Sequence, residues 1–356
     1  MSSALRAQSV TLPAGITSTI QLSEADAGAI KTFVDASTPD LSGSDPTKVH
    51  NAMDALRSPF STTNIRSMSI SFRHRYSDAL MPTLQGMITP ALLADASSDL
   101  PVRALSVAGE LGTDDAADLL VAQIDAQRAD VRYQAAYGLR RTFYMVNNNT
   151  ITPIMTDTKV ASLIKAIGAR AATETDPLVL DGLIRALDEA GKSDAARPQV
   201  VRVLGGAIST NFKSKHPSAQ PAEAAALVRA ALAMRGMLSD PAAIPASDVR
   251  IGAEMAGQLA AYAARAVNDK VVSAGGNQEL RRALADLATA SQNAVLVAYS
   301  KLNIGQQAPK AAPLGDTLRT GTVANDAQFV VDVGSFVNDV LAKAPYNFPA
   351  SSFQLK

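Results

Sequence analysis

The chain has 356 residues, of which 47% are hydrophobic and 19% charged, and this composition excludes wholesale disorder. Its 33 Lys and Arg residues balance 33 Asp and Glu residues, so no net charge attracts it to nucleic acid or to an anionic membrane. The absence of cysteine excludes disulfides, thiolate catalysis and cysteine-bound metals.

Aromatic residues make up only 4% of the chain and tryptophan is absent, so we expect a core built mainly from Ala, Leu, Val and Ile. Such side chains suit close packing of helices on helices. No stretch approaches the roughly 20 continuous apolar residues that a membrane helix requires. We therefore predict no membrane span.

The N-terminal sequence does not indicate in which cellular compartment the protein is located. The first 22 residues lack the apolar run of about 7–15 residues found in secretory signals. The protein therefore either stays in the cytoplasm or is extracytoplasmic with its signal already removed. A cysteine-free chain of this size fits an exported or virion-type protein somewhat better than a cytosolic one.

Helix signals dominate from Ser23 to Ala344, where apolar residues recur at spacings of three and four. Several predicted helices begin with a proline, because proline in the first turn gives up an N–H that would have no partner there. These starts are Asp45-Pro46, Thr89-Pro90 and Asp176-Pro177, and a further start is expected at Thr113 or Asp114.

One segment has the alternation typical of a strand. Met68-Ser69-Ile70-Ser71-Phe72 alternates apolar and polar residues over five positions, which is too short to predict a sheet. The alternative is that residues 58–76 form an irregular connection between an N-terminal helical cap and the helices that follow.

An internal repeat is the most informative feature of the chain. Residues 101–112 (PVRALSVAGELG) align with residues 130–141 (DVRYQAAYGLRR) at a shift of 29 residues, which places Gly109 on Gly138. Small residues at such positions let helices approach closely, and stacked repeats then bury a core that no single repeat could form.

Looser copies of the repeat open at Asp176 and Asp248. The pattern resembles HEAT repeats, particularly the short repeats of phycobilisome-lyase-like proteins, in which a D-x-V-R or P-x-V-R start precedes a helix of small residues. The resemblance is good over residues 95–205 and weak over 222–302. In that family the Asp and Arg at the helix start form a ladder between adjacent repeats, which implies a structural role for Arg103, Asp130, Arg132, Asp248 and Arg250.

The predicted fold is all-α, a right-handed α-solenoid of HEAT-like helical hairpins with an N-terminal helical cap and a C-terminal helix plus extended tail. Pro, Gly, Gln and Thr are frequent in residues 303–322, without a sustained apolar period, so this stretch is predicted to be a linker. The predicted division is a cap region over 1–88, a repeat array over 89–302, the linker over 303–322, and a helix with an aromatic tail over 323–356.

A helix of about 25 residues is predicted from Asn277 to Leu302, because its apolar residues fall near one stripe. Such a helix suits a terminal cap of the array. A coiled-coil seam with a partner helix is the alternative, which the Ser and Ala residues on the stripe disfavour.

The C-terminal tail concentrates aromatic residues in a chain that has few of them. Tyr346, Phe348 and Phe353 lie within residues 345–356, after a last predicted helix. A tail of this kind can dock on a neighbouring molecule, so these three residues are predicted to bind a partner. The alternative is that helix and tail fold back on their own repeat array.

Two short basic groups are candidates for contact with a phosphate or with an acidic partner. One contains Arg66, Arg73, His74 and Arg75, and we assign Arg73 and Arg75 to the partner-binding surface. The other contains Lys213, Lys215 and His216. Zero net charge argues against general binding of nucleic acid.

Sequence motifs for catalysis, cofactors or metals are not found. His50, His74 and His216 do not have the spacing of a zinc site, and no nucleophile elbow or dinucleotide-binding loop occurs. Residues 187–193 (LDEAGKS) resemble the end of a phosphate-binding loop but lack a glycine where Ala186 stands. We therefore predict no catalytic residue, no cofactor and no metal.

The function predicted from these observations is binding rather than turnover. The protein is expected to be a non-catalytic protein–protein interaction scaffold or a structural assembly subunit that uses the solenoid surface and the tail. Its partner is expected to be another protein within a larger assembly, and a homo-oligomer is compatible with this. Two alternatives stay open: an enzyme or enzyme accessory with a pocket on a concave face, and an exported or virion-type assembly protein.

Overall fold

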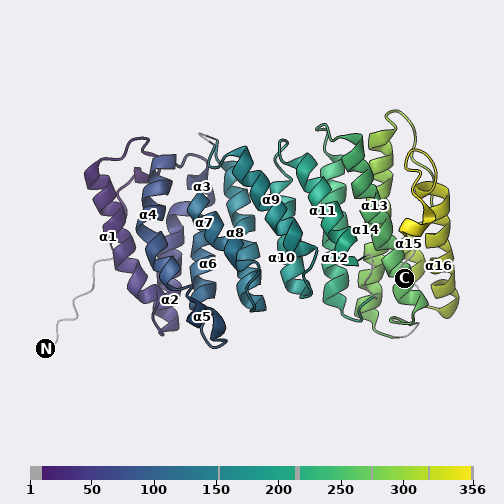
Figure 1. Ribbon diagram of the computed structural model, residues 1–356, viewed down its shortest axis with the longest axis horizontal. Helices are drawn as coiled ribbons and strands as arrows, with labels where there is room; N and C mark the ends of the chain where they lie inside the picture. The colour runs from purple at the N-terminus through teal and green to yellow at the C-terminus, as the bar shows by residue number, and fades with distance from the viewer. Residues whose placement is uncertain (1–9, 151–152, 213–216, 274–275, 320, 354–356) are drawn as a thin grey trace. The chain divides into compact units, whose positions relative to one another are not determined.

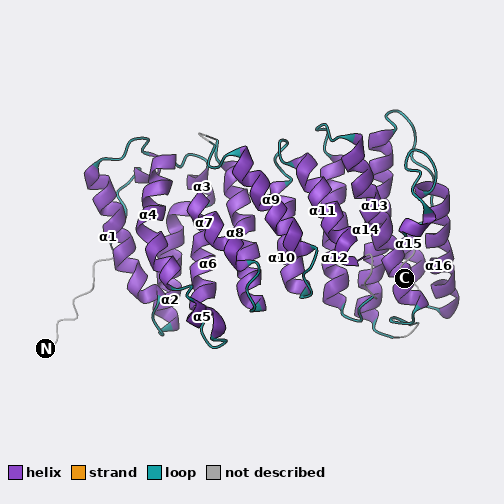
Figure 2. Ribbon diagram, viewed as in Figure 1, coloured by secondary structure: helices purple, strands orange, loops and turns teal. Residues whose placement is uncertain are grey.

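The structure is a computed structural model that describes residues 10–150, 153–212, 217–273, 276–319 and 321–353. Within these ranges the regular structure is helical and no residue lies in a strand, as Figure 2 shows. The prediction of an all-α fold is therefore confirmed, whereas the right-handed superhelix stays a prediction. Among the described residues, no helix combines the length and the hydropathy that a bilayer crossing demands.

The chain divides into two compact units, residues 1–159 and 160–356. Helix α9 (Asp157–Ala171) begins just before the boundary and continues into the second unit. The sequence predicts a repeat array over residues 89–302, so the boundary between the units lies inside the predicted array.

The first unit consists of helices joined by short connections (Figure 1). Its helices are α1 Glu24–Leu41, α2 Pro46–Arg57, α3 Thr62–Ile65, α4 Ile70–Gly86, α5 Pro90–Ala94, α6 Leu100–Leu111, α7 Asp114–Gln123 and α8 Ala129–Asn148.

These helices pack in two layers. Helix α6 lies between α2 and α8 in one layer, and α4 lies between α1 and α7 in the other. The layers meet where α6 contacts α4 and α7. Each fully buried leucine in such a core contributes roughly 1.5–3 kcal/mol. Five that are fully buried here are Leu56, Leu80, Leu105, Leu120 and Leu139.

The strand prediction for residues 68–72 is wrong, because this segment begins a helix. The Ser69 hydroxyl caps α4 by accepting a hydrogen bond from the Phe72 N–H at 3.1 Å. From Phe72 onward the apolar residues recur every fourth position, through Tyr76 to Leu80, and all three are buried. The helical period therefore extends beyond the five alternating residues and determines the structure. The alternative of an irregular connection over 58–76 holds only for the short helical turns before α4.

The second unit is also helical throughout its described residues. Its further helices are α10 Pro177–Ala190, α11 Arg197–Phe212, α12 Pro221–Ser239, α13 Ala246–Asn268, α14 Gln278–Leu302, α15 Leu314–Arg319 and α16 Val323–Phe336, which continues as a π-helical turn over Val337–Leu341.

Two layers are formed in the second unit as well. Helix α12 lies between α10 and α14, and α13 lies between α11 and α16. The long helix predicted from Asn277 is confirmed as α14, with the Asn277 side chain accepting hydrogen bonds from the N–H groups of Glu279 and Leu280. It does not end the stack, because α15 packs on it as well.

Three helices begin at the predicted prolines: α2 at Pro46, α5 at Pro90 and α10 at Pro177. The Asp45 carboxylate accepts a hydrogen bond from the Thr47 N–H at 2.9 Å at the start of α2. The Asp176 carboxylate makes the same contact with the Leu178 N–H at 2.9 Å at the start of α10. Each side chain satisfies an N–H that has no partner within its own helix.

The predicted linker over residues 303–322 contains helix α15. Leu314 and Leu318 of this helix are buried, so the segment is packed rather than free. Gly315 allows the contact, because a Cβ there would lie 2.4 Å from the carbonyl oxygen of Ala285 in α14. The frequent Pro and Gly residues lie mostly in the irregular segment before α15. Helix α15 itself was not predicted, because its two leucines are too few to show a helical period.

Candidate functional site

A groove opens on the second unit between α12 and α14. Its volume is about 620 Å³, within the range usual for ligand-binding clefts. Leu238, Leu296 and Val297 supply apolar surface to the groove, and Arg235 and Asn293 supply polar groups. Arg235 is exposed and Leu238 is buried, so an apolar floor lies beneath a cationic rim.

Both helices that form the groove are rich in buried alanine, and short side chains let neighbouring helices approach closely. The buried alanines are Ala224, Ala226, Ala230, Ala231 and Ala233 of α12, and Ala285, Ala288, Ala290, Ala294 and Ala298 of α14.

One end of the groove is closed by the loop that follows α12. The Lys301 ammonium of α14 donates hydrogen bonds to the carbonyl oxygens of Asp240 and Ala242, the second at 2.9 Å. The Asp240 carboxylate pairs with Arg197 at 2.8 Å. The charges of Lys301 and Asp240 are therefore engaged within the protein.

Arg235 is different, because its guanidinium makes no hydrogen bond or ion pair with any residue that the structure describes. Two exposed apolar side chains belong to the same elements. Leu232 lies one turn earlier on α12 and is 44% exposed, and Ile304 lies in the loop that leads to Ala308 and is 92% exposed. Arginine is enriched among the residues that dominate binding energy at protein interfaces, and exposed apolar side chains can mark interaction surfaces.

The three aromatic residues predicted to bind a partner lie inside the second unit. Tyr346 is fully buried, and its hydroxyl donates a hydrogen bond to the Val295 carbonyl oxygen. The Tyr346 and Phe348 rings are stacked with centroids 5.6 Å apart, and Phe353 meets Phe348 edge-on at 6.0 Å. The tail is therefore folded back on its own unit, and these side chains are not part of an open surface.

Arg73 and Arg75 lie on the same helix, α4, but in opposite environments. Arg75 is exposed, whereas Arg73 is fully buried and donates a hydrogen bond to the Leu111 carbonyl oxygen at 2.7 Å. Burial, assisted by the nearby charge of Arg141, lowers the pKa of Arg73 to about 10. Arg73 therefore holds the C-terminal end of α6 and does not reach the surface, so of the two only Arg75 can contact a partner.

Arg103 makes contacts within the first unit, and none of the partners described here is another residue of the predicted ladder. Its guanidinium pairs at 2.6 Å with Asp99, the N-cap residue of α6. It also donates hydrogen bonds to the carbonyl oxygens of Leu41 at 3.0 Å and Gly43 at 2.8 Å. Arg103 thereby ties the start of α6 to the connection between α1 and α2.

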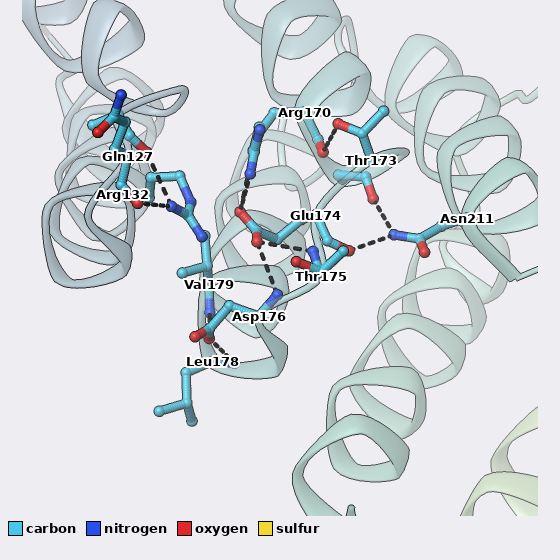
Figure 3. A network of polar contacts seen from close by, with 12 residues as sticks. Gln127, Arg132, Arg170, Thr173, Glu174, Thr175, Asp176, Leu178, Val179 and Asn211 are labelled. Atoms are coloured by element: carbon cyan, nitrogen blue, oxygen red, sulfur yellow. Dashed lines mark hydrogen bonds and ion pairs between the residues drawn. The ribbon is translucent and has the colours of Figure 1, made fainter. Parts of the chain in front are cut away.

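Asp130 and Arg132 make local contacts at the start of α8. Asp130 pairs with Arg128 at 2.6 Å, and this hydrogen-bonded pair lowers the pKa of the Asp130 carboxyl. The Arg132 guanidinium donates hydrogen bonds to the carbonyl oxygens of Ala126 at 2.9 Å and Gln127 at 2.8 Å (Figure 3). Both residues fix the turn that precedes α8.

Asp248 makes a contact between helices. Its buried carboxylate, on α13, pairs with Arg202 of α11 at 2.9 Å. Arg250 lies two residues later and holds the tail, since it donates a hydrogen bond to the Pro345 carbonyl oxygen at 2.7 Å and lies over the Phe348 ring at 5.1 Å.

A buried carboxylate organises the turn between α9 and α10 (Figure 3). Glu174 accepts hydrogen bonds from the N–H groups of Thr175 at 2.9 Å and Asp176 at 2.8 Å, and it pairs with Arg170 at 2.7 Å. The Asn211 amide donates a hydrogen bond to the Glu174 carbonyl oxygen at 3.0 Å. Both carboxylate oxygens are engaged, so this acid links helices and is not poised for proton transfer.

In the described part of the chain, no group of three or more His, Asp or Glu side chains could hold a metal ion. His50 pairs with Asp54 at the surface at 3.2 Å, and His74 is exposed. The second basic group, with Lys213, Lys215 and His216, lies outside the described residues. The segment 187–193 ends helix α10, for which Gly191 is the C-cap.

Comparisons with known proteins leave the family open. No protein-family model matches the chain, and no curated protein matches it. One solved structure that is similar is the crystal structure of an engineered protein, with 16% sequence identity and a TM-score of 0.35, covering 95% of this chain and 80% of that chain.

The groove between α12 and α14 was not found from the sequence. Its two walls come from helices that α13 separates along the chain, and no motif marks either of them. Arg235 also lies outside the clustered basic groups, because the other cation of this helix, Arg229, is six residues away. The available signal is the sequence Leu232-Ala233-Met234-Arg235, in which an exposed leucine stands one turn from an arginine.

Proposed function

We propose that this protein is a non-catalytic interaction scaffold, and that it binds another protein through the groove between α12 and α14. The observation that carries the proposal is the unpaired Arg235 above an apolar floor of Leu238, Leu296 and Val297. A partner that inserts an aliphatic or aromatic side chain and presents a carboxylate to Arg235 would satisfy both features.

Binding is favoured over turnover by the chemistry of the groove. Its acidic residue, Asp240, is already paired with Arg197, and its lysine, Lys301, is hydrogen-bonded to two carbonyl oxygens. Acid–base catalysis needs a group that can exchange a proton with a substrate. None of the residues that line this groove is a histidine or an unpaired carboxylate.

The repeat architecture supports the same proposal. In each unit the helices pack on their nearest neighbours in two layers, and the two clearest repeat copies are joined by a close contact between Gly109 and Gly138. We infer that the repeats are HEAT-like. Arrays of this kind present broad surfaces, on which a groove between successive helices can hold part of a partner.

Affinity capture from the native source tests the proposal. Full-length protein, an Arg235→Glu variant and a matched Arg282→Glu variant are used as baits, and captured chains are quantified by mass spectrometry. Arg282 is the appropriate control because it is an exposed arginine of α14 that lacks any described partner and does not line the groove.

We expect a partner that Arg235→Glu depletes about tenfold, which corresponds to about 1.4 kcal/mol of lost binding. Arg282→Glu should retain the same partner. Circular dichroism of both variants checks that they remain folded. Equal capture by all three baits would contradict the assignment of the groove.

A further inference from the structure

A second cavity lies between the end of α13 and the start of α16, within the second unit. Its volume is about 430 Å³. Val267 and Val272 line it from the α13 side, and Val323, Ala327 and Val330 line it from α16. Val323 is 75% exposed, so the cavity opens beside an apolar side chain that no described part of the chain covers.

Two charged residues line the cavity, and only one of them is neutralised. Asp326 is paired with Arg281, a fully buried residue of α14. Lys270 is exposed, and its ammonium has no hydrogen bond or ion pair with any described residue. The cavity therefore combines valine and alanine side chains, the polar residues Asn268 and Ser273, and one uncompensated positive charge.

The turn that carries Lys270 is held in a defined conformation. Lys270 has a φ of 57°, a left-handed conformation that is uncommon for residues other than glycine. Its N–H bonds the Val267 carbonyl oxygen at 3.1 Å, and the N–H groups of Val271 and Val272 both bond the Ala266 carbonyl oxygen, at 2.9 and 3.3 Å. These bonds fix Val272 in the cavity wall and the Lys270 backbone beside it.

The geometry points to a binding site for an aliphatic monocarboxylate, such as a medium-chain fatty acid. The hydrocarbon chain lies against the valines, where burial of apolar surface favours binding. The carboxylate faces the ammonium of Lys270, which leaves neither charge unpaired.

Alternative ligand chemistries fit the cavity less well. A peptide would bring many backbone amides, and Asn268 and Ser273 are the uncharged polar residues that line the cavity, so most of these amides would be left without hydrogen bonds. A phosphate carries a larger negative charge and is usually held by charged donors, whereas this cavity offers one cation and is also lined by the Asp326 carboxylate. The inference is independent of the groove between α12 and α14, because the two cavities share no lining residue.

Titration of the full-length protein with decanoate, below its micelle concentration, tests the site by calorimetry. An Ala327→Phe variant fills the cavity, and Ala324→Phe is its matched control, because Ala324 is an exposed residue of the same helix that does not line the cavity. A Lys270→Glu variant reverses the charge, and decanol replaces decanoate as a probe with the same chain and no charge.

We expect decanoate to bind the full-length protein and the Ala324→Phe variant equally, and to lose measurable binding to Ala327→Phe. Lys270→Glu should weaken decanoate binding about tenfold and leave decanol binding unchanged. The proposal is overturned if decanoate does not bind, if Ala327→Phe binds it like the full-length protein, or if decanol binds as tightly as decanoate.

Discussion

Gly109 of α6 and Gly138 of α8 are in direct backbone contact, since a Cβ added at Gly109 would lie 2.6 Å from the Cα of Gly138. The two glycines occupy the same position in repeat copies that are 29 residues apart. The alignment therefore identifies a close contact between the two helices, and this contact explains why Gly109 carries no side chain. At Gly138 a Cβ would instead lie 2.5 Å from the Leu120 side chain of α7.

Substitution of Gly109 by alanine tests this contact. The new methyl group would have to push the two helices apart, and overpacking of this kind usually costs about 1–3 kcal/mol. This exceeds the roughly 0.5–1 kcal/mol that alanine gains over glycine within a helix. We therefore expect a lower free energy of unfolding, measured by urea denaturation followed by circular dichroism.

Gly28→Ala is the matched control for Gly109→Ala. Gly28 also lies within a helix of the first unit, and a Cβ there would meet nothing within 4 Å. We expect it to leave stability unchanged or to raise it by about 0.5–1 kcal/mol. Equal destabilisation by both substitutions would show that glycine is needed for a reason other than the contact between α6 and α8.

The helical fold could be predicted because its signals are local. Helix starts depend on residues within one turn, as at Asp45 and Asp176, whose side chains bond N–H groups two residues later. The contact between Gly109 and Gly138 could also be predicted, because the internal repeat aligns these two positions although they are far apart in the sequence. The alternation of apolar and polar residues over 68–72 predicted a strand, which is wrong. Five alternating residues are weaker evidence than the helical spacing of apolar residues that begins at Phe72 and continues beyond them.

The candidate groove and the position of the tail could not be predicted, because both depend on contacts between residues far apart in the sequence. Phe348 bears the same local signature whether it docks on its own chain or on another. In the structure Phe348 contacts Arg250 of its own chain, and these two residues are 98 positions apart in the sequence. Likewise, Arg73 stands among the exposed His74 and Arg75, and nothing in that basic run indicates that it alone is buried.

Stability should decrease at alkaline pH because three tyrosines are buried. Burial raises the pKa of Tyr76, Tyr262 and Tyr346 above the usual value of 10. The phenols ionise near pH 10 in the unfolded chain but stay protonated in the folded one, so the unfolded state binds fewer protons above that pH. The free energy of unfolding is therefore highest below pH 10 and falls as the pH rises further, by up to about 1.4 kcal/mol per pH unit for each tyrosine.

The prediction is checked by measuring the midpoint of urea denaturation at several pH values between 8 and 11. Tyr346→Phe removes one of the three ionisable groups while keeping the ring, so its stability should fall less steeply above pH 10 than that of the unsubstituted protein. The variant also loses the hydrogen bond to the Val295 carbonyl oxygen, which lowers its stability at every pH by about 1 kcal/mol. An unchanged slope would indicate that Tyr346 is accessible to solvent.

Arg73 offers a comparison between two substitutions. Arg73→Ala removes the packing of a fully buried side chain and leaves the Leu111 carbonyl oxygen without its donor, for an expected loss of about 3 kcal/mol. Arg73→Met also loses that hydrogen bond, but it keeps much of the volume. It further removes a buried charge, two of whose nitrogens, Nε and Nη2, have no partner among the described residues.

We therefore expect Arg73→Met to be at least about 1 kcal/mol more stable than Arg73→Ala, measured by urea denaturation at pH 7. A methionine variant as unstable as the alanine variant would show that the charge itself stabilises the first unit, through its contact with the Phe60 ring 5.7 Å away.

Removal of residues 343–356 tests whether the tail docks on its own chain in solution. The tail covers α13 and α14, where Gly257 leaves room for Phe353, since a Cβ at Gly257 would lie 2.6 Å from that ring. Phe348 and Tyr346 are buried beside it. Deletion exposes this apolar surface, so we expect a loss of several kcal/mol in the free energy of unfolding and increased binding of a hydrophobic dye.

The truncated protein should also self-associate in sedimentation velocity experiments, because an exposed apolar face of this kind tends to be covered by another molecule. Val331→Ala is the control, since Val331 is an apolar residue of α16 that is already exposed and its loss should change stability by less than about 0.5 kcal/mol. If truncation changes neither stability nor sedimentation, the tail is not docked on α13 and α14 in solution, and Tyr346, Phe348 and Phe353 become free to bind a partner. If the full-length protein is itself a dimer that truncation converts to a monomer, the same aromatic contacts are made between two chains, with the tail of each docked on the other.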